Sequence, residues 1–251
     1  MGFETGIEWT NATWNPWHGC HKVSAGCKNC YMFTEKRRYG QDPNVVVQSK
    51  TTFGAPLRWK EPKLVFTCSW SDFFIEEADP WRQTAYEIMR RTPHTYQVLT
   101  KRIERALSLA LLEDPLIPNM WLGVSVENRA AKIRIDWLRE ASVALRFLSI
   151  EPLLEDIGEL NLRGIHWVIV GGESGRGARS FEIEWARSII SQCRSASVPC
   201  FVKQLGAKPF YHGGDIDAYF QLTLSGKGGD WEEWPADIRV REMPCPNLTC
   251  I

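Results

Sequence analysis

Three cysteines near the start of the chain, Cys20, Cys27 and Cys30, form a C-x6-C-x2-C pattern. Cys27 and Cys30 are three positions apart, so one turn of helix would place both thiolates on the same side. Gly19 and Gly26 favour a loop that folds back and presents Cys20 to the same point, because glycine tolerates tight backbone angles. Three thiolates leave one metal position open, which suits a reactive cluster better than a closed structural site.

This spacing alone leaves three interpretations open. An iron–sulfur cluster is favoured, since thiolates are its usual ligands. A structural zinc would need a fourth ligand, which His18 or His21 would supply. The third interpretation is that the thiols bind no metal.

Composition limits the classes of partner. The chain has 251 residues, 30 Lys and Arg, 30 Asp and Glu, and eight Cys. Zero net charge removes the simplest argument for nucleic-acid binding but allows a local basic groove. No run approaches the roughly 18 apolar residues of a membrane span, and the first residues lack the features of a secretory signal. We therefore expect a cytoplasmic protein with no membrane contact, in which thiols are more often buried, catalytic or metal-bound than paired.

Short apolar runs alternate with longer stretches of helical periodicity, which predicts βαβ units and a mostly parallel sheet. The predicted strands are a short one within 7–13, then 63–69, 96–100, 121–126, 144–150, 167–170 and 199–202. The predicted helices are 29–39, 80–91, 101–112, 129–140 and 181–195. About six such units make a partial barrel or an open doubly wound sheet, and periodicity does not separate the two.

The alternation stops at Pro209, where turn-rich segments begin. Glycine pairs and Trp-Glu-Glu-Trp-Pro are not typical of core strands. We predict a barrel-type domain over residues 1–208 and an irregular extension over 209–251, packed on the barrel as a small cap.

Polar residues follow the predicted strands, and ligands of parallel α/β barrels collect at the carboxyl ends of strands. The residues predicted to bind a cofactor are Ser69, Ser71, Asp72, Lys101, Ser125, Glu127, Glu151, Gly171, Gly172 and Glu173. Many of them have an alternative role as helix N-caps. Gly171 and Gly172 fit either a nucleotide-binding turn or a plain tight turn.

Several strings of the sequence resemble a phage- and prophage-associated family with a three-cysteine motif. They are Gly6-Ile7-Glu8-Trp9-Thr10, Ala12-Thr13-Trp14-Asn15-Pro16, Trp121-Leu122-Gly123-Val124-Ser125-Val126-Glu127-Asn128, Ser149-Ile150-Glu151-Pro152-Leu153 and Val170-Gly171-Gly172-Glu173-Ser174-Gly175. The cysteine loop ahead of repeated βα units also looks like the radical S-adenosylmethionine (SAM) superfamily, whose common spacing is C-x3-C-x2-C. In layout the chain is distantly similar to spore photoproduct lyase, on Cys68-Ser69-Trp70-Ser71-Asp72 and Leu99-Thr100-Lys101-Arg102.

The resemblance implies a partial (β/α)6 TIM-like barrel of the radical SAM type. It implies that Cys20, Cys27 and Cys30 hold a [4Fe–4S] cluster that binds SAM, and that one electron cleaves SAM to methionine and a 5′-deoxyadenosyl radical. The expected partners are reduced flavodoxin or ferredoxin as electron donor and a separately encoded three-Cys-motif partner protein. A nucleic-acid base or nucleoside is the substrate suggested by the layout.

Two other classes of protein remain open. One is a zinc-bearing binding module of phage origin without catalysis, and the other is an unrelated α/β enzyme with Lys101 or Glu151 as a base. Basic residues (Lys36, Arg37, Arg38, Arg90, Arg91, Lys101, Arg102) would track phosphates or form solvated helix faces. Trp14, Trp17 and Trp70 would stack a base or pack in the core. Cys245 and Cys250 form a C-x4-C pair without an assigned role.

Overall fold

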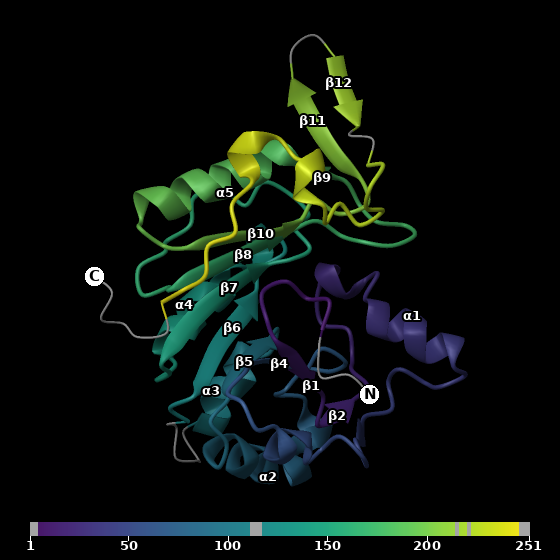
Figure 1. Cartoon of the computed structure of the whole chain (residues 1–251), viewed down its shortest axis with the longest axis vertical. Helices are drawn as coiled ribbons and strands as arrows, with labels where there is room; N and C mark the ends of the chain where they lie inside the picture. The colour runs from purple at the N-terminus through teal and green to yellow at the C-terminus, as the bar shows by residue number, and fades with distance from the viewer. Residues whose placement is uncertain (1–4, 111–116, 214–215, 220–221, 246–251) are drawn as a thin grey trace. The chain divides into compact units, whose positions relative to one another are not determined.

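The computed structural model describes residues 5–110, 117–213, 216–219 and 222–245, and it is a mixed α/β structure (Figure 1). Its strands are β1 (Ala12–Trp14), β2 (Trp17–His18), β3 (Val47–Gln48), β4 (Leu64–Thr67), β5 (Thr95–Thr100), β6 (Met120–Ser125), β7 (Leu145–Ile150), β8 (Trp167–Gly171), β9 (Phe181–Glu182), β10 (Cys200–Gln204), β11 (Pro209–Gly213) and β12 (Ile216–Tyr219). Its α-helices are α1 (Tyr31–Arg38), α2 (Asp79–Arg90), α3 (Ile103–Ala110), α4 (Ile133–Glu140) and α5 (Ile183–Ser195).

The main sheet has seven strands in the order β1-β4-β5-β6-β7-β8-β10. The pairs β1–β4, β4–β5, β5–β6, β7–β8 and β8–β10 are parallel. Strand order rises steadily with chain order, whereas a doubly wound sheet reverses direction at a switch point. The partial-barrel topology predicted from the sequence is thus confirmed at this level, and the doubly wound alternative is wrong.

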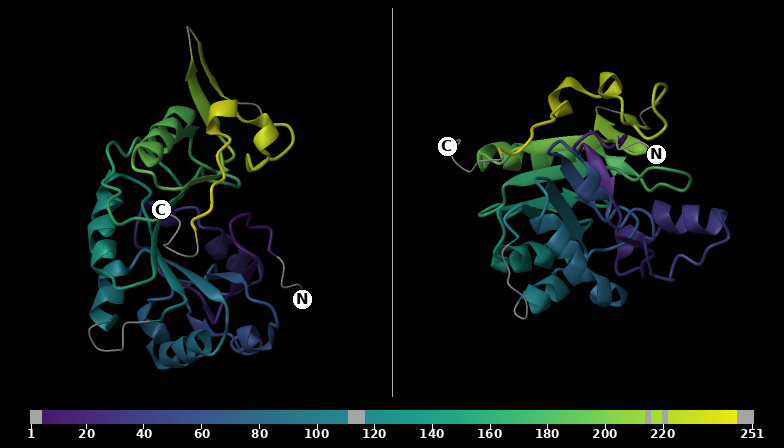
Figure 2. Two further views of the ribbon diagram at one scale, coloured as in Figure 1. Left: turned by 60° about the vertical axis from the view of Figure 1, so that its left-hand side comes forward. Right: turned by 60° about the horizontal axis from the view of Figure 1, so that its bottom comes forward.

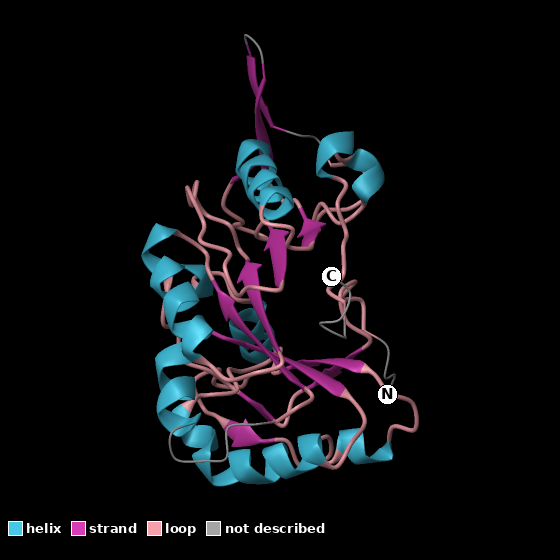
Figure 3. Ribbon diagram, turned by 90° about the vertical axis from the view of Figure 1, so that its left-hand side faces the viewer, coloured by secondary structure: helices cyan, strands magenta, loops and turns pink. Residues whose placement is uncertain are grey.

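The chain divides into two compact units, and each is described by itself. Unit 1 consists of Met1–Ser125 with Ile133–Arg146, and unit 2 of Val126–Lys132 with Phe147–Ile251. In unit 1, helices α2, α3 and α4 lie outside the strands (Figure 3). Its core is rich in aromatic residues: Trp14 lies 5.4 Å from Tyr96 and Trp17 lies 5.1 Å from Phe73 between ring centroids.

Unit 2 contains β8 and β10, with α5 packed against both. All five residues of β8 are buried, as expected for a central parallel strand covered on both faces. Trp167 of β8 packs edge-on to Phe201 of β10, with ring centroids 6.2 Å apart. The β11–β12 hairpin belongs to this unit and joins β9 in a small sheet (Figure 2).

Two segments differ from the sequence-based expectation. Part of the tail predicted to be irregular is the β11–β12 hairpin, in which Phe210 pairs with Tyr219. The helix predicted from residue 181 begins at Ile183, because Phe181 and Glu182 form β9 and pair with Pro209 and Phe210. The hairpin pairs neighbouring segments, whereas the β9–β11 pairing joins segments distant in sequence, which local periodicity does not report.

Across the described ranges, none of the helices combines the length and the apolar character needed to traverse a bilayer.

Candidate functional site

The cysteine loop of unit 1 is tied to the segment after β4. The Gly19 amide donates to the carbonyl oxygen of Trp70 at 3.0 Å, and the Ser71 hydroxyl donates to the carbonyl oxygen of Gly19 at 2.6 Å. Gly19 has φ of +102°, and a Cβ there would collide with the carbonyl oxygen of Val45. Only glycine fits this turn, so the expectation that Gly19 folds the loop back is confirmed.

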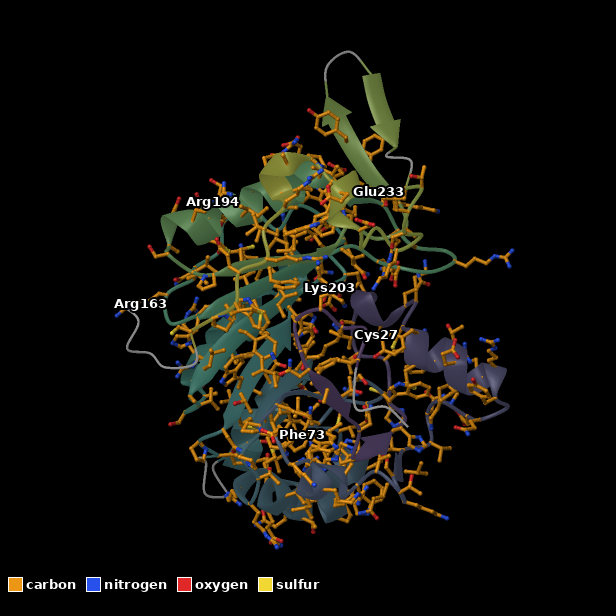
Figure 4. The ribbon with its side chains drawn as sticks, viewed as in Figure 1. Cys27, Phe73, Arg163, Arg194, Lys203 and Glu233 are labelled. Atoms are coloured by element: carbon orange, nitrogen blue, oxygen red, sulfur yellow. The ribbon has the colours of Figure 1, made fainter. Side chains whose placement is uncertain are left out.

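Cys27 and Cys30 do not share one turn of α-helix, contrary to the prediction. Cys27 ends a short 3-10 helix (Ala25–Cys27), and Cys30 is the residue just before α1 (Figure 4). The Cys30 amide donates to the carbonyl oxygen of Cys27 at 3.4 Å, so the two are joined by a turn between helices. Burial raises the pKa of the Cys30 thiol, and the amides of Met32 and Phe33 act in the opposite direction.

Cys20 faces Arg102. A guanidinium nitrogen of Arg102 lies 3.8 Å from the Cys20 sulfur atom. Burial raises the pKa of the Cys20 thiol to about 11, and Arg102 opposes this shift. The charge of Cys27 raises the pKa of both Cys20 and Cys30, which places the three thiols in one electrostatic neighbourhood.

The thiols of Cys20, Cys27 and Cys30 are the donors available to the cluster implied by the resemblance. Three half-buried thiols with interacting charges are the ligand chemistry of an iron–sulfur cluster. Among the described residues, no group of three or more His, Cys, Asp or Glu side chains converges as metal ligands. The donors therefore fit the group in chemistry and neighbourhood, and the sulfur atoms do not meet at one point in this structure.

The two histidines of the loop have different surroundings. His21 Nε2 lies 2.5 Å from Glu77 Oε1, so the His21 side chain is engaged by a carboxylate outside the loop. The buried Nδ1 atom of His18 has no hydrogen-bond partner. Burial lowers the pKa of His18, with a smaller effect from the charge of Lys36.

Asp72, predicted to bind a cofactor, is a buried acceptor at the ends of β4 and β5. Its Oδ1 atom accepts from the Phe74 amide at 3.0 Å and the Thr100 hydroxyl at 2.8 Å. Its Oδ2 atom accepts from the Lys101 amide at 3.0 Å and lies 3.2 Å from the Arg102 guanidinium. The carboxylate thus fixes the start of α3 relative to the segment after β4.

Three other predicted residues of unit 1 have mainly structural contacts. The Ser69 hydroxyl lies 3.0 Å from Asn15 Nδ2 and 3.2 Å from Asn15 Oδ1. The Ser71 hydroxyl serves the loop contact described above, and the Ser125 carbonyl oxygen accepts from Arg134 at 2.8 Å. Lys101 differs, because burial raises the pKa of the Cys30 thiol and the positive charge of Lys101 partly opposes this rise.

Unit 2 brings together another group of predicted residues. Glu151, just after β7, forms an ion pair with Lys203 of β10, with 3.1 Å between Oε1 and Nζ (Lys203 is labelled in Figure 4). Gly171 of β8 is the glycine that permits this arrangement, because a Cβ there would collide with the Glu151 carboxylate. No role was predicted for Lys203 from the sequence. The one feature that could have pointed to it is a charged residue at the end of an apolar run.

Close packing explains Gly172, and hydrogen bonds with Arg179 explain Glu173. A Cβ at Gly172 would collide with the carbonyl oxygen of Leu205, so the tight-turn interpretation accounts for this glycine. Glu173 accepts from the Arg179 side chain at 2.9 and 2.6 Å and from its amide at 3.0 Å. Glu127 is fully buried, and its carbonyl oxygen accepts from the Leu154 amide at 3.0 Å.

The proposed base-stacking and phosphate-tracking residues are corrected at several positions. Trp14 and Trp17 are fully buried core residues, so their alternative role in the core is the correct one. Lys36 is only 2% exposed, and burial lowers its pKa. Arg102 is occupied by Asp72 and the cysteine loop, whereas Arg37, Arg38, Arg90 and Arg91 are exposed.

The remaining cysteines separate by environment. Cys68, Cys193 and Cys200 are buried. Burial raises the pKa of the Cys68 thiol well above its ordinary value. Cys245 is disulfide-bonded, and Cys250 lies outside the described residues.

Comparison with known proteins places the chain in a family without an assigned activity. Residues 4–228 match a family described as "Protein of unknown function (DUF5131)", and the chain belongs to this family. Neither the curated proteins nor the solved structures contain a significant match.

Proposed function

We propose that this protein is a radical SAM enzyme whose cysteine loop holds a [4Fe–4S] cluster through Cys20, Cys27 and Cys30. The observation that carries the proposal is the clustering of three half-buried thiols beside the ends of parallel strands β4 and β5. Strand ends of this kind are where parallel α/β barrels place their chemistry. When bound, the cluster supplies one electron that cleaves SAM to methionine and a 5′-deoxyadenosyl radical.

The residues of the chain have distinct tasks in this proposal. The three thiolates bind iron, and Gly19 and Ser71 fix the start of the loop that carries them. Asp72 holds Arg102 and the backbone of Lys101 in place. The charge of Lys101 near Cys30 favours the thiolate form that iron requires.

Three of the residues predicted to contact a cofactor remain part of the proposal. Ser69 and Ser71 offer hydroxyls near the cysteine loop. Glu151 of unit 2 stays a cofactor-contact hypothesis from the sequence, and within its own unit it forms an ion pair with Lys203. Reduced flavodoxin or ferredoxin as donor, a three-Cys-motif partner protein and a nucleic-acid base or nucleoside as substrate complete the proposal.

Anaerobic reconstitution tests the proposal directly. The purified protein is incubated with iron and sulfide, then with SAM and dithionite, and 5′-deoxyadenosine is quantified. Iron uptake with 5′-deoxyadenosine formation is the expected result. Failure to bind iron, or zinc bound by four ligands in its place, would overturn the proposal. Addition of DNA or nucleosides to the same assay tests the substrate class through an increased rate.

A further inference from the structure

Arg102 connects three features of unit 1 that are far apart in the sequence. It follows β5 and immediately precedes α3, and its side chain is 14% exposed. Its guanidinium contacts the Asp72 carboxylate at 3.2 Å, the Cys20 sulfur atom at 3.8 Å and the His21 carbonyl oxygen at 2.9 Å. A planar fork with several N–H donors is needed for three acceptors in different directions.

The ion pair with Asp72 explains why the guanidinium holds this orientation. Asp72 is itself fixed by Phe74, Thr100 and the Lys101 amide, and the Arg102 amide donates to the Thr100 hydroxyl at 2.8 Å. A purely structural pair would be complete with these contacts. Arg102 also reaches Cys20 and His21, so part of its hydrogen-bonding capacity is directed at the cysteine loop.

The positive charge of Arg102 would also affect the reduction potential of a cluster bound to the loop. Asp72, Cys20 and Glu77 are the acidic groups whose charges interact with it. Reduction of an iron–sulfur cluster adds one negative charge, and cationic N–H donors near the ligand sulfurs favour the reduced state. A cationic donor beside one ligand sulfur would therefore raise the reduction potential.

We propose that Arg102 is a positioning residue with two effects on the cluster site, a proposal that rests on the function proposed above. It anchors Cys20 through the carbonyl oxygen of His21, and it raises the reduction potential of the cluster through its charge and N–H group at the Cys20 sulfur.

The test compares Arg102→Met and Arg102→Lys with Arg105→Met as the matched control. Arg105 lies on α3, three positions after Arg102, and pairs with Asp79, so its loss removes a nearby cation without touching the loop. Hydrogen–deuterium exchange of residues 19–30 in the metal-free protein measures the anchoring. Redox titration of the loaded protein with dithionite, followed by electron paramagnetic resonance, measures the potential.

Arg102→Met is expected to speed exchange in the loop about tenfold, as for loss of one charge-assisted hydrogen bond. It is also expected to shift the potential to more negative values. Arg102→Lys keeps the charge and loses the fork, so its exchange increases while its potential shifts less. If Arg102→Met matches Arg105→Met in both measurements, the inference is wrong. Should the wild type bind no iron, the proposed function fails, and exchange alone still decides the anchoring role.

Discussion

The carboxylate of Asp72 and the guanidinium of Arg102 form a buried ion pair with 3.2 Å between Oδ2 and Nη1, beyond the ends of two adjacent parallel strands. Four protein donors surround this one carboxylate. The pair therefore couples the stability of unit 1 to the position of the cysteine loop.

Replacement of Asp72 by Asn is expected to lower the free energy of unfolding by about 3 kcal/mol. An amide nitrogen would face the Lys101 amide and leave the Arg102 charge without a buried partner. Urea denaturation followed by circular dichroism gives the value. Asp136→Asn is the control, because Asp136 is 63% exposed and its pair with Arg139 contributes less than about 1 kcal/mol. If the two changes lowered the free energy of unfolding equally, the Asp72–Arg102 pair would contribute no more than an exposed pair, and the prediction would be wrong.

Cys27→Ala is expected to abolish the visible absorption of the reconstituted protein, because one of three proposed ligands is lost. Ultraviolet–visible spectra and iron analysis after identical reconstitution provide the measurement. Cys193→Ala serves as the control, since Cys193 is a buried residue of α5 in unit 2. Unchanged absorption in Cys27→Ala would place the ligands elsewhere.

Gly172→Ala is expected to destabilise the protein by about 1–3 kcal/mol, within the range for overpacked sites. The new methyl group would meet backbone atoms of Leu205, which are held in place by the hydrogen bond from the Leu205 amide to Gly228. Gly226→Ala is the control, because no atom lies within 4 Å of a Cβ at that position. Thermal unfolding of both variants provides the measurement, and the prediction is wrong if their midpoint temperatures coincide.

Tyr96 is expected to make the protein less stable as the pH rises into the alkaline range. Burial raises the pKa of Tyr96 from 10.0 to about 12, so the unfolded chain loses the phenol proton first. The free energy of unfolding therefore falls as pH rises from about 10 to 12, by up to about 3 kcal/mol from this group. Urea denaturation across this pH range is expected to show a shallower decline for Tyr96→Phe.

The Tyr96 prediction needs a control that removes the same hydrogen bond and keeps the phenol. The Tyr96 and Thr92 hydroxyls lie 2.7 Å apart, so Thr92→Val meets this condition. It is expected to be less stable than the wild type at neutral pH and to retain the decline at high pH. A decline of the same slope in Tyr96→Phe would assign the alkaline effect to other groups.

The strands could be predicted because their apolar runs are continuous and buried. All six residues of β6 are buried, and its observed start at Met120 is one residue before the predicted one. The direction of winding could not be predicted, because it depends on which strands pair rather than on where they lie in the sequence. Strand β11 escaped prediction for a related reason, because its residues Pro209 and Phe210 pair with Phe181 and Glu182 of β9.

The candidate site was accessible from the sequence only in part. Cysteine spacing identifies Cys20, Cys27 and Cys30 as a group, because metal ligands recur at short intervals. No local signal connects Arg102 with Cys20, since the contact spans 82 positions. The pair of Glu151 and Lys203 is likewise 52 positions apart, and it forms because β7 and β10 pair with opposite edges of β8.

The attachment of the cysteine loop has a consequence for how its length can change in evolution. The Cys20 amide is fixed to the carbonyl oxygen of Pro43 at 2.9 Å, and Val23 in the intervening segment is 47% exposed. Insertion or deletion at an exposed loop tip costs little, about 0.6 kcal/mol for each doubling of loop length. We therefore expect a change in the length of the six-residue gap near Val23 to leave the anchored start of the loop in place.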